Sequence, residues 1–325
     1  MISTRLAILE LTHRHRLDAA TLGALWRIAR LGQPSPELDT LLRRAVGMLA
    51  ALLAGLGLIF LVAANLDALG RREKFILLQL CVGAACLGAA FLPRLRTSLA
   101  LLGLLVIGAL FAYFGQTYQT GADPWQLFAV WAVLALPLAL GARTDIVWSA
   151  WVIVAMTGLT AWDAAQSGWW RFAGPNLGAH MLVALLASAL AVLMSQPLAR
   201  FSGAGRVAFN LAVLFATTSL GSAGMLALFA SSSGTALYYL LSLVLLVVAA
   251  ALLTRRRLFD VTALSVIALG LIILFIAGMV RVIGLGHGGE IGMLLVAGFT
   301  TVGLMALAVR GILALMREYG SGGKP

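Results

Sequence analysis

The side chains best suited to chemistry gather in one polar segment of an otherwise apolar chain. Residues 115–126 read Gly-Gln-Thr-Tyr-Gln-Thr-Gly-Ala-Asp-Pro-Trp-Gln and lie between two long apolar runs. Amide and hydroxyl groups at this depth need hydrogen-bonding partners, because an unpaired polar group in apolar surroundings costs free energy. Such groups could bind a small polar solute or a segment of another protein.

Part of this segment also has an interpretation that needs no function. Asp123, Pro124 and Gln126 have the layout of a helix start: an N-cap, a proline in the first turn and a glutamine that completes a capping box. Capping does not explain the polar side chains of Gln116, Tyr118 and Gln119, which precede this helix start. We expect the preceding helix to continue one turn past Gly115, which brings Tyr113 close to those groups.

Two further polar residues, Asn65 and Asp67, end the first apolar run and are expected at the same face of the membrane. Polar groups in membrane proteins tend to face the bundle interior or a wet cavity. The alternative is that Asn65 caps its helix and that Asp67 is solvated. We predict an outward-facing polar cluster formed by Asn65, Asp67, Tyr113, Gln116, Tyr118, Gln119, Asp123 and Gln126.

Four ionisable residues elsewhere are expected on the same outer side: Asp163, His180, His287 and Glu290. Such side chains bind divalent metals, but their spacing matches no metal motif, so neither a metal nor a cofactor is predicted. The sequence also contains no Walker A, Gly-x-Ser-x-Gly, His-Glu-x-x-His or Cys-x-x-Cys pattern. A membrane enzyme built on these four residues is the weakest of three functional hypotheses.

The elements that position these residues must be membrane helices. Hydrophobic residues make up 62% of the chain and charged residues 11%, and the mean hydropathy is +1.01; an average soluble domain carries about 25% charged residues. A hydrocarbon core about 30 Å thick needs about 20 apolar residues per helix. The runs that qualify are Ala45–Ala64, Phe75–Leu92, Thr97–Gln116, Pro124–Gly141, Ile146–Trp162, Leu177–Ser195, Val207–Ala230, Ala236–Leu253, Phe259–Val280 and Ile291–Val309. We predict an all-α, polytopic transmembrane helix bundle of about ten helices.

The basic residues orient this bundle, because short cytoplasmic loops carry the excess of Lys and Arg. With both termini inside, 18 of the 23 basic residues are cytoplasmic and five are not. The loop from Asn65 to Lys74 does not follow this pattern, because it holds three basic residues on the outer side. The net charge of +11 therefore predicts contact with an anionic inner leaflet and no nucleic-acid partner. Aromatic anchoring at the headgroup layer is expected of Trp125, Trp148, Trp162, Trp169 and Trp170.

The first 44 residues differ from the rest in being helical in pattern but charged. Asp18 is placed to cap the second of two short helices, and Pro36 is placed in the first turn of the helix that enters the membrane. We interpret this segment as an amphipathic hairpin on the inner leaflet, with a docking module or a DNA-binding motif as alternatives. The predicted organisation is a cytoplasmic hairpin at 1–44, a membrane domain at 45–310 and a cytoplasmic tail at 311–325.

The polar segment from Gly115 to Phe128, followed by Trp131 and Pro137, resembles the hallmark segment of a bacterial membrane family catalogued as domain of unknown function 2157. Ala63-Ala64-Asn65, with Lys74 beyond it, is similar to that family's second recurring feature, although the family usually has Trp where this chain has Leu66. The resemblance covers roughly residues 10–150. It implies a predicted inner-membrane protein, and it implies no activity, because the family has none established.

Two functional hypotheses stand ahead of the enzyme. The first is a non-enzymatic subunit or scaffold of an envelope complex in the bacterial inner (plasma) membrane, with a membrane-protein partner. The second is a carrier or channel for a small polar solute, whose outward-facing mouth is the polar cluster at the first, third and fourth helices. A carrier requires a hydrated cavity that reaches inward past Gln116. The apolar runs hold almost no ionisable residues, which weakens a proton-coupled version of transport.

Overall fold

The computed structural model describes most of the chain beyond residue 35. The described residues are 36–64, 70–118, 121, 123–167, 176–230, 234–284 and 290–321, together with 10, 14, 15, 18, 21, 23 and 24. The chain divides into two compact units, Met1–Ala50 and Ala51–Pro325. The predicted N-terminal hairpin lies largely outside the described residues, but the backbone N–H of Thr21 donates to a carboxylate oxygen of Asp18 at 3.0 Å, as predicted for a helix cap.

All regular secondary structure in the described residues is helical, which confirms the all-α prediction. The helices are α3 (Pro36–Ala64), α4 (Arg71–Phe91), α5 (Arg96–Tyr118), α6 (Pro124–Ala142), α7 (Asp145–Gln166), α8 (Leu177–Leu193), α9 (Gln196–Ser202), α10 (Arg206–Phe229), α11 (Ala236–Leu253), α12 (Val261–Gly284) and α13 (Glu290–Ser321). Each of the ten predicted apolar runs coincides with one of them. The fourth run is a full helix, α6, although Pro137 lies in its interior.

Eight helices in the described part of the chain are long and apolar enough to cross a membrane. Leu177–Leu193 and Gln196–Ser202 would make a ninth span if the 75° bend between them lies within one crossing. The first predicted span differs, because only Ala45–Gly57 of α3 is found as a shorter apolar helix. A polytopic helical bundle is therefore confirmed, whereas ten crossings and the inside position of both termini stay predictions.

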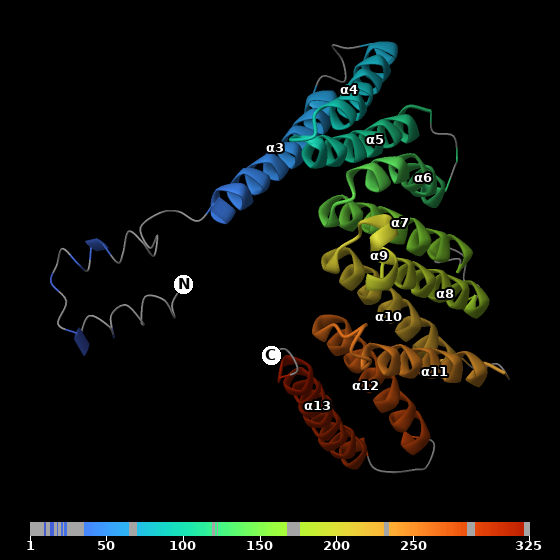
Figure 1. Cartoon of the computed structure of the whole chain (residues 1–325). Helices are drawn as coiled ribbons and strands as arrows, with labels where there is room; N and C mark the ends of the chain where they lie inside the picture. Colours follow the sequence, from blue (N-terminus) through green and yellow to red (C-terminus); the bar gives the residue numbers. More distant parts are fainter. Residues whose placement is uncertain are drawn as a thin grey trace. The chain divides into compact units, whose positions relative to one another are not determined.

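Within the unit Ala51–Pro325, most helices from α4 onward pack beside the helix that follows them in the chain (Figure 1). α10 has further neighbours, because it packs on α7, α8, α11 and α12 together. Small residues permit this close packing: Ala208, Ala212 and Ala223 of α10 are at most 1% exposed. Without a hydrophobic driving force between helices in lipid, close van der Waals contact is what stabilises such interfaces.

Tryptophan side chains join neighbouring helices through their indole N–H groups. Trp131 of α6 donates to the carbonyl of Leu104 in α5 at 2.8 Å, and its ring occupies the space that a side chain at Gly108 would fill. Trp148 donates to the carbonyl of Ser202 at 2.8 Å and is 2% exposed. The predicted headgroup anchoring is therefore wrong for Trp148, because an interhelical hydrogen bond and burial hold this ring inside the protein.

A second link joins the starts of α7 and α10. The carboxylate of Asp145 accepts hydrogen bonds from the backbone N–H groups of Gly205 at 3.1 Å, Val207 at 2.9 Å and Ala208 at 2.9 Å. A helix leaves its first N–H groups without internal acceptors, so Asp145 caps α10 from another helix. The arrangement places Arg143, between α6 and α7, and Arg200 of α9 at the same end of the unit. The charge pattern predicts both residues on the cytoplasmic side.

Candidate functional site

The polar cluster is built on the end of α5, which extends past Gly115 to Tyr118 as predicted. Tyr113 is 7% exposed and packs with Leu78 of α4 and Val106 of α5, which are each 1% exposed. The last turn of α5 therefore lies on a dry, closely packed layer between the two helices.

Lys74, in the first turn of α4, also belongs to this site. In the sequence it was a basic residue of the first outer loop and part of the family resemblance, and its burial was not predicted. It is 3% exposed, and its Nζ lies 6.0 Å from the centre of the Tyr113 ring, a distance at which a cation is attracted to an aromatic face. Phe75 adds aromatic contacts, with ring centres 4.9 Å from Tyr113 and 5.9 Å from Tyr118. A lysine under aromatic rings at the end of a membrane helix is a functional candidate, because burying its charge is costly.

The remaining described members of the polar cluster face outward. Gln116, Tyr118, Asp123 and Gln126 are all exposed, and Tyr118 is 56% exposed. Asn65, Asp67 and Gln119 lie outside the described residues, so the eight-residue cluster stays a prediction. What the structure places together is an aromatic and cationic end of α4 and α5 with exposed amide and carboxyl groups beside it.

Asp123 does not cap α6 through its side chain. The helix begins at Pro124 as predicted, and the N–H of Gln126 donates to the backbone carbonyl of Asp123 at 3.0 Å. The carboxylate instead accepts from the indole N–H of Trp125 at 3.4 Å. The predicted capping box is therefore wrong, because the Asp123 side chain turns to the neighbouring ring and leaves its acceptor capacity at the surface.

A second polar site joins the end of α7 to the start of α8. Nδ1 of His180 lies 2.5 Å from Oδ2 of Asp163, and Nε2 of the same ring lies 3.1 Å from Oγ of Ser167. The His180 and Asp163 side chains are 13% and 18% exposed. From the sequence, Asp163 and His180 were named as outer-side residues without being paired, and Ser167 was not noticed. Ser167 and His180 are 13 positions apart and lie at the ends of different helices, so only the packing of α7 against α8 brings them together.

Two further ionisable residues, His287 and Glu290, were expected on the outer side. His287 lies outside the described residues, and Glu290 begins α13. No group of three or more His, Cys, Asp or Glu side chains suited to a metal ion occurs in the part of the chain that the structure describes.

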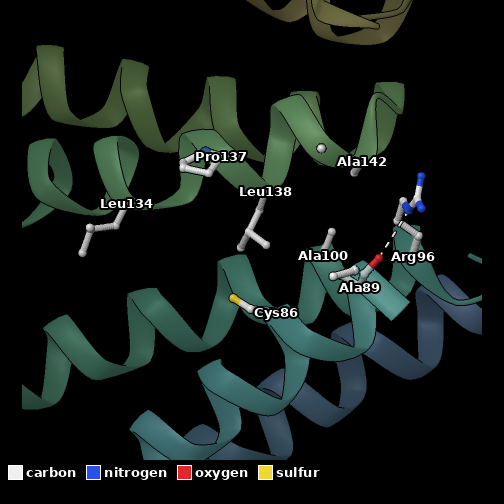
Figure 2. A pocket seen from close by; sticks show the side chains of 10 residues that line it. Cys86, Ala89, Arg96, Ala100, Leu134, Pro137, Leu138 and Ala142 are labelled. Atoms are coloured by element: carbon white, nitrogen blue, oxygen red, sulfur yellow. Dashed lines mark hydrogen bonds between the residues drawn. The ribbon is translucent and has the colours of Figure 1, made fainter. Parts of the chain in front are cut away.

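A third feature is a groove at the opposite end of α4 and α5, shown in Figure 2. Its volume is about 490 Å³, and it is lined by Cys86, Ala89, Ala90, Arg96, Ala100, Leu134, Pro137, Leu138, Gly141 and Ala142. The small residues of α4 and α6 leave this space open between these two helices and α5. Nε of Arg96 donates to the carbonyl of Ala89 at 3.3 Å, which holds the guanidinium at the rim of an apolar groove (Figure 2).

Comparison with known proteins agrees with the resemblance inferred from the sequence. The model of the family described as "Predicted membrane protein (DUF2157)" matches residues 9–148. The match ends shortly after the start of α7, so it includes the polar cluster and the Arg96 groove but not the Asp163, His180 and Ser167 site. No curated protein and no solved structure matches the chain.

Proposed function

Starting from this match to a family of predicted membrane proteins, we propose that the chain is a multi-pass subunit or scaffold of a complex in the bacterial inner membrane. Its partner contacts the exposed polar surface formed by Gln116, Tyr118, Asp123 and Gln126. The observation that carries this proposal is that these groups face outward from a closely packed end of α4 and α5.

The packing beneath the polar surface favours a partner over a transported solute. A solute path would need polar or hydrated lining on the way inward from Gln116. One turn inward is Tyr113, and two turns further are Val106 and Leu78, all closely packed. The Arg96 groove opens at the other end of these helices, and a further apolar pocket of about 300 Å³ lies among α8, α10, α11 and α12.

Site-specific photocrosslinking in native membranes tests this proposal. A photoreactive amino acid placed at Gln116 or Gln126 is expected to form a covalent adduct with one defined membrane protein, identified by mass spectrometry. Leu80 of α4, which is 66% exposed in an apolar helix, is the matched control and should crosslink to lipid alone. Lipid adducts at all three positions would reject the partner surface.

We also propose that an anionic phospholipid occupies the Arg96 groove. The charge pattern predicts this end of α4 and α5 on the cytoplasmic side, where anionic lipids carry the negative surface potential. A guanidinium presents several N–H donors to a phosphate, and the Ala and Gly surfaces behind it offer an apolar channel for an acyl chain. Headgroup and chain would then be held by neighbouring parts of one groove.

Lipid retention during purification tests this second proposal. In native mass spectrometry with equal phosphatidylglycerol and phosphatidylcholine, the wild type should retain phosphatidylglycerol preferentially, and Arg96→Gln should abolish the preference. Gly141→Leu should lower retention of both lipids, since a Cβ at Gly141 meets no atom within 4 Å and the added side chain fills the groove without strain. Arg281→Gln, an exposed change at the end of α12, is the control. Unchanged lipid preference in Arg96→Gln would reject the site.

A further inference from the structure

The second polar site has the hydrogen-bond order of a nucleophilic catalyst. Ser167 Oγ contacts Nε2 of His180 at 3.1 Å, and Nδ1 of that ring contacts Oδ2 of Asp163 at 2.5 Å. A carboxylate at Nδ1 requires a proton there, which leaves Nε2 as the acceptor for the serine hydroxyl. A nucleophile, a base and a group that orients the base are thus arranged in series, as covalent catalysis requires.

Backbone hydrogen bonds of the two helices position these residues. Ser167 follows the last residue of α7, and its N–H donates to the carbonyl of Asp163 at 2.9 Å. His180 lies in the first turn of α8, where its N–H donates to the carbonyl of Asn176 at 3.1 Å. Oδ1 of Asp163 is buried and has no hydrogen-bond partner among the described residues. The positive charge that the His180 ring acquires when it accepts the serine proton therefore stabilises this carboxylate.

We propose that Asp163, His180 and Ser167 form an esterase site at the end of α7 and α8, with a carboxylic ester of a membrane lipid as the substrate class. This activity is separate from the partner and lipid contacts proposed above. The ends of two apolar helices place the serine near the headgroup layer, where the ester groups of glycerolipids lie. All three side chains are partly exposed rather than sealed, as the approach of an ester to the hydroxyl requires.

The reaction balances with water as the only co-reactant. Ser167 Oγ bonds to the ester carbonyl carbon while its proton passes to Nε2 of His180. The bond from that carbon to the alkoxy oxygen then breaks, and the imidazolium gives its proton to the departing alcohol. Water attacks the acyl-serine, with His180 again taking the proton, and releases the carboxylic acid and the free serine. Asp163 holds the ring in the required tautomer throughout.

The first turn of α8 offers a place for the charge that develops on the carbonyl oxygen. The backbone N–H groups of Leu177 and Gly178 precede His180 in this turn, and a helix leaves such groups without internal acceptors. Asn176 accepts instead from the N–H of Ala179 at 3.2 Å. The donors at the helix start therefore lie on the same turn as the base.

An active-site probe tests the proposal on the purified full chain in nanodiscs. A fluorophosphonate probe should label the wild type, and mass spectrometry of the digest should place the adduct on Ser167. Ser167→Ala should abolish labelling, and His180→Gln should slow it by about 100-fold or more, the usual contribution of a general base.

A matched control separates catalysis from folding. Ser188→Ala removes another partly buried hydroxyl of α8, which donates to the carbonyl of Ala184 at 2.7 Å, and should leave labelling unchanged. Size-exclusion elution and thermal unfolding of each variant report whether it folds. An unlabelled wild type, or equal labelling of the wild type and a folded Ser167→Ala variant, overturns the proposal. Full labelling of a folded His180→Gln variant with lowered thermal stability would assign the site a structural role and overturn it as well.

Discussion

Asp145→Ala, at the first residue of α7, should destabilise this protein strongly. The change removes the acceptor of three backbone N–H groups at the start of α10. The bonds to Gly205 and Ala208 are partly buried and the bond to Val207 is exposed. A partly buried donor left without an acceptor costs about 1–2 kcal/mol, whereas water replaces the exposed acceptor at little cost. With the loss of the negative charge at two helix starts, the expected decrease in the free energy of unfolding is about 3 kcal/mol.

The measurement is reversible unfolding in sodium dodecyl sulfate mixed micelles, followed by tryptophan fluorescence. Trp148 donates to Ser202 beside the affected linker and should report the change directly. Asp123→Ala is the matched control, because Asp123 precedes α6 without a side-chain cap bond, and it should change the free energy of unfolding by less than about 0.5 kcal/mol. Asp145→Asn, which keeps one acceptor oxygen, should fall between the two. Equal stability of the Asp145→Ala and Asp123→Ala variants would refute the capping argument.

Three further predictions concern particular contacts. Gly108→Ala should lower the free energy of unfolding by about 1–3 kcal/mol, because the added methyl occupies the space of the Trp131 ring; rescue by Trp131→Leu in an SDS titration checks this, and no rescue would contradict it. Gly278→Ala should lower the free energy of unfolding, because the added methyl displaces the Tyr239 hydroxyl, which donates to the carbonyl of Leu274 at 3.0 Å. In a Tyr239→Phe background the same substitution should lower the free energy of unfolding by less. Hydrogen bonds from Thr21 hold the pKa of Asp18 below its ordinary value, so the cap contributes at neutral pH and is lost as the pH falls through the folded-state pKa; an Asp18 carboxyl titration by nuclear magnetic resonance that shows no lowering would contradict this.

The membrane helices could be predicted from the sequence because their signal is local. About 20 consecutive apolar residues are needed for each crossing, and charges or Gly, Pro and Ser clusters mark where a run stops. The start of α6 at Pro124 and the extension of α5 past Gly115 followed from residues next to them in the chain. The first span was harder, because the charged start of α3 and its apolar part form one helix from Pro36 to Ala64.

The sites could be predicted only in part, because their side chains come from different helices. Gln116 and Asp123 were identified from the sequence because they are polar residues between apolar runs, and both are exposed in the structure. Nothing in the sequence around Lys74 indicated that it would be buried against Tyr113, since charge counting treats every basic residue near a helix end alike. The capping of α10 by Asp145 was equally hidden, because 60 positions separate Asp145 from Gly205.

The sequence by itself determined that this protein is a polytopic helical membrane protein, because hydropathy is a sum over neighbouring residues and needs no knowledge of the fold. It also determined the resemblance to a family of predicted membrane proteins, through one contiguous polar segment. Only the tertiary structure decided which polar groups meet. Hydrogen bonds of about 3 Å depend on how α7 lies against α8, and that geometry is what turned Asp163, His180 and Ser167 from scattered residues into one site.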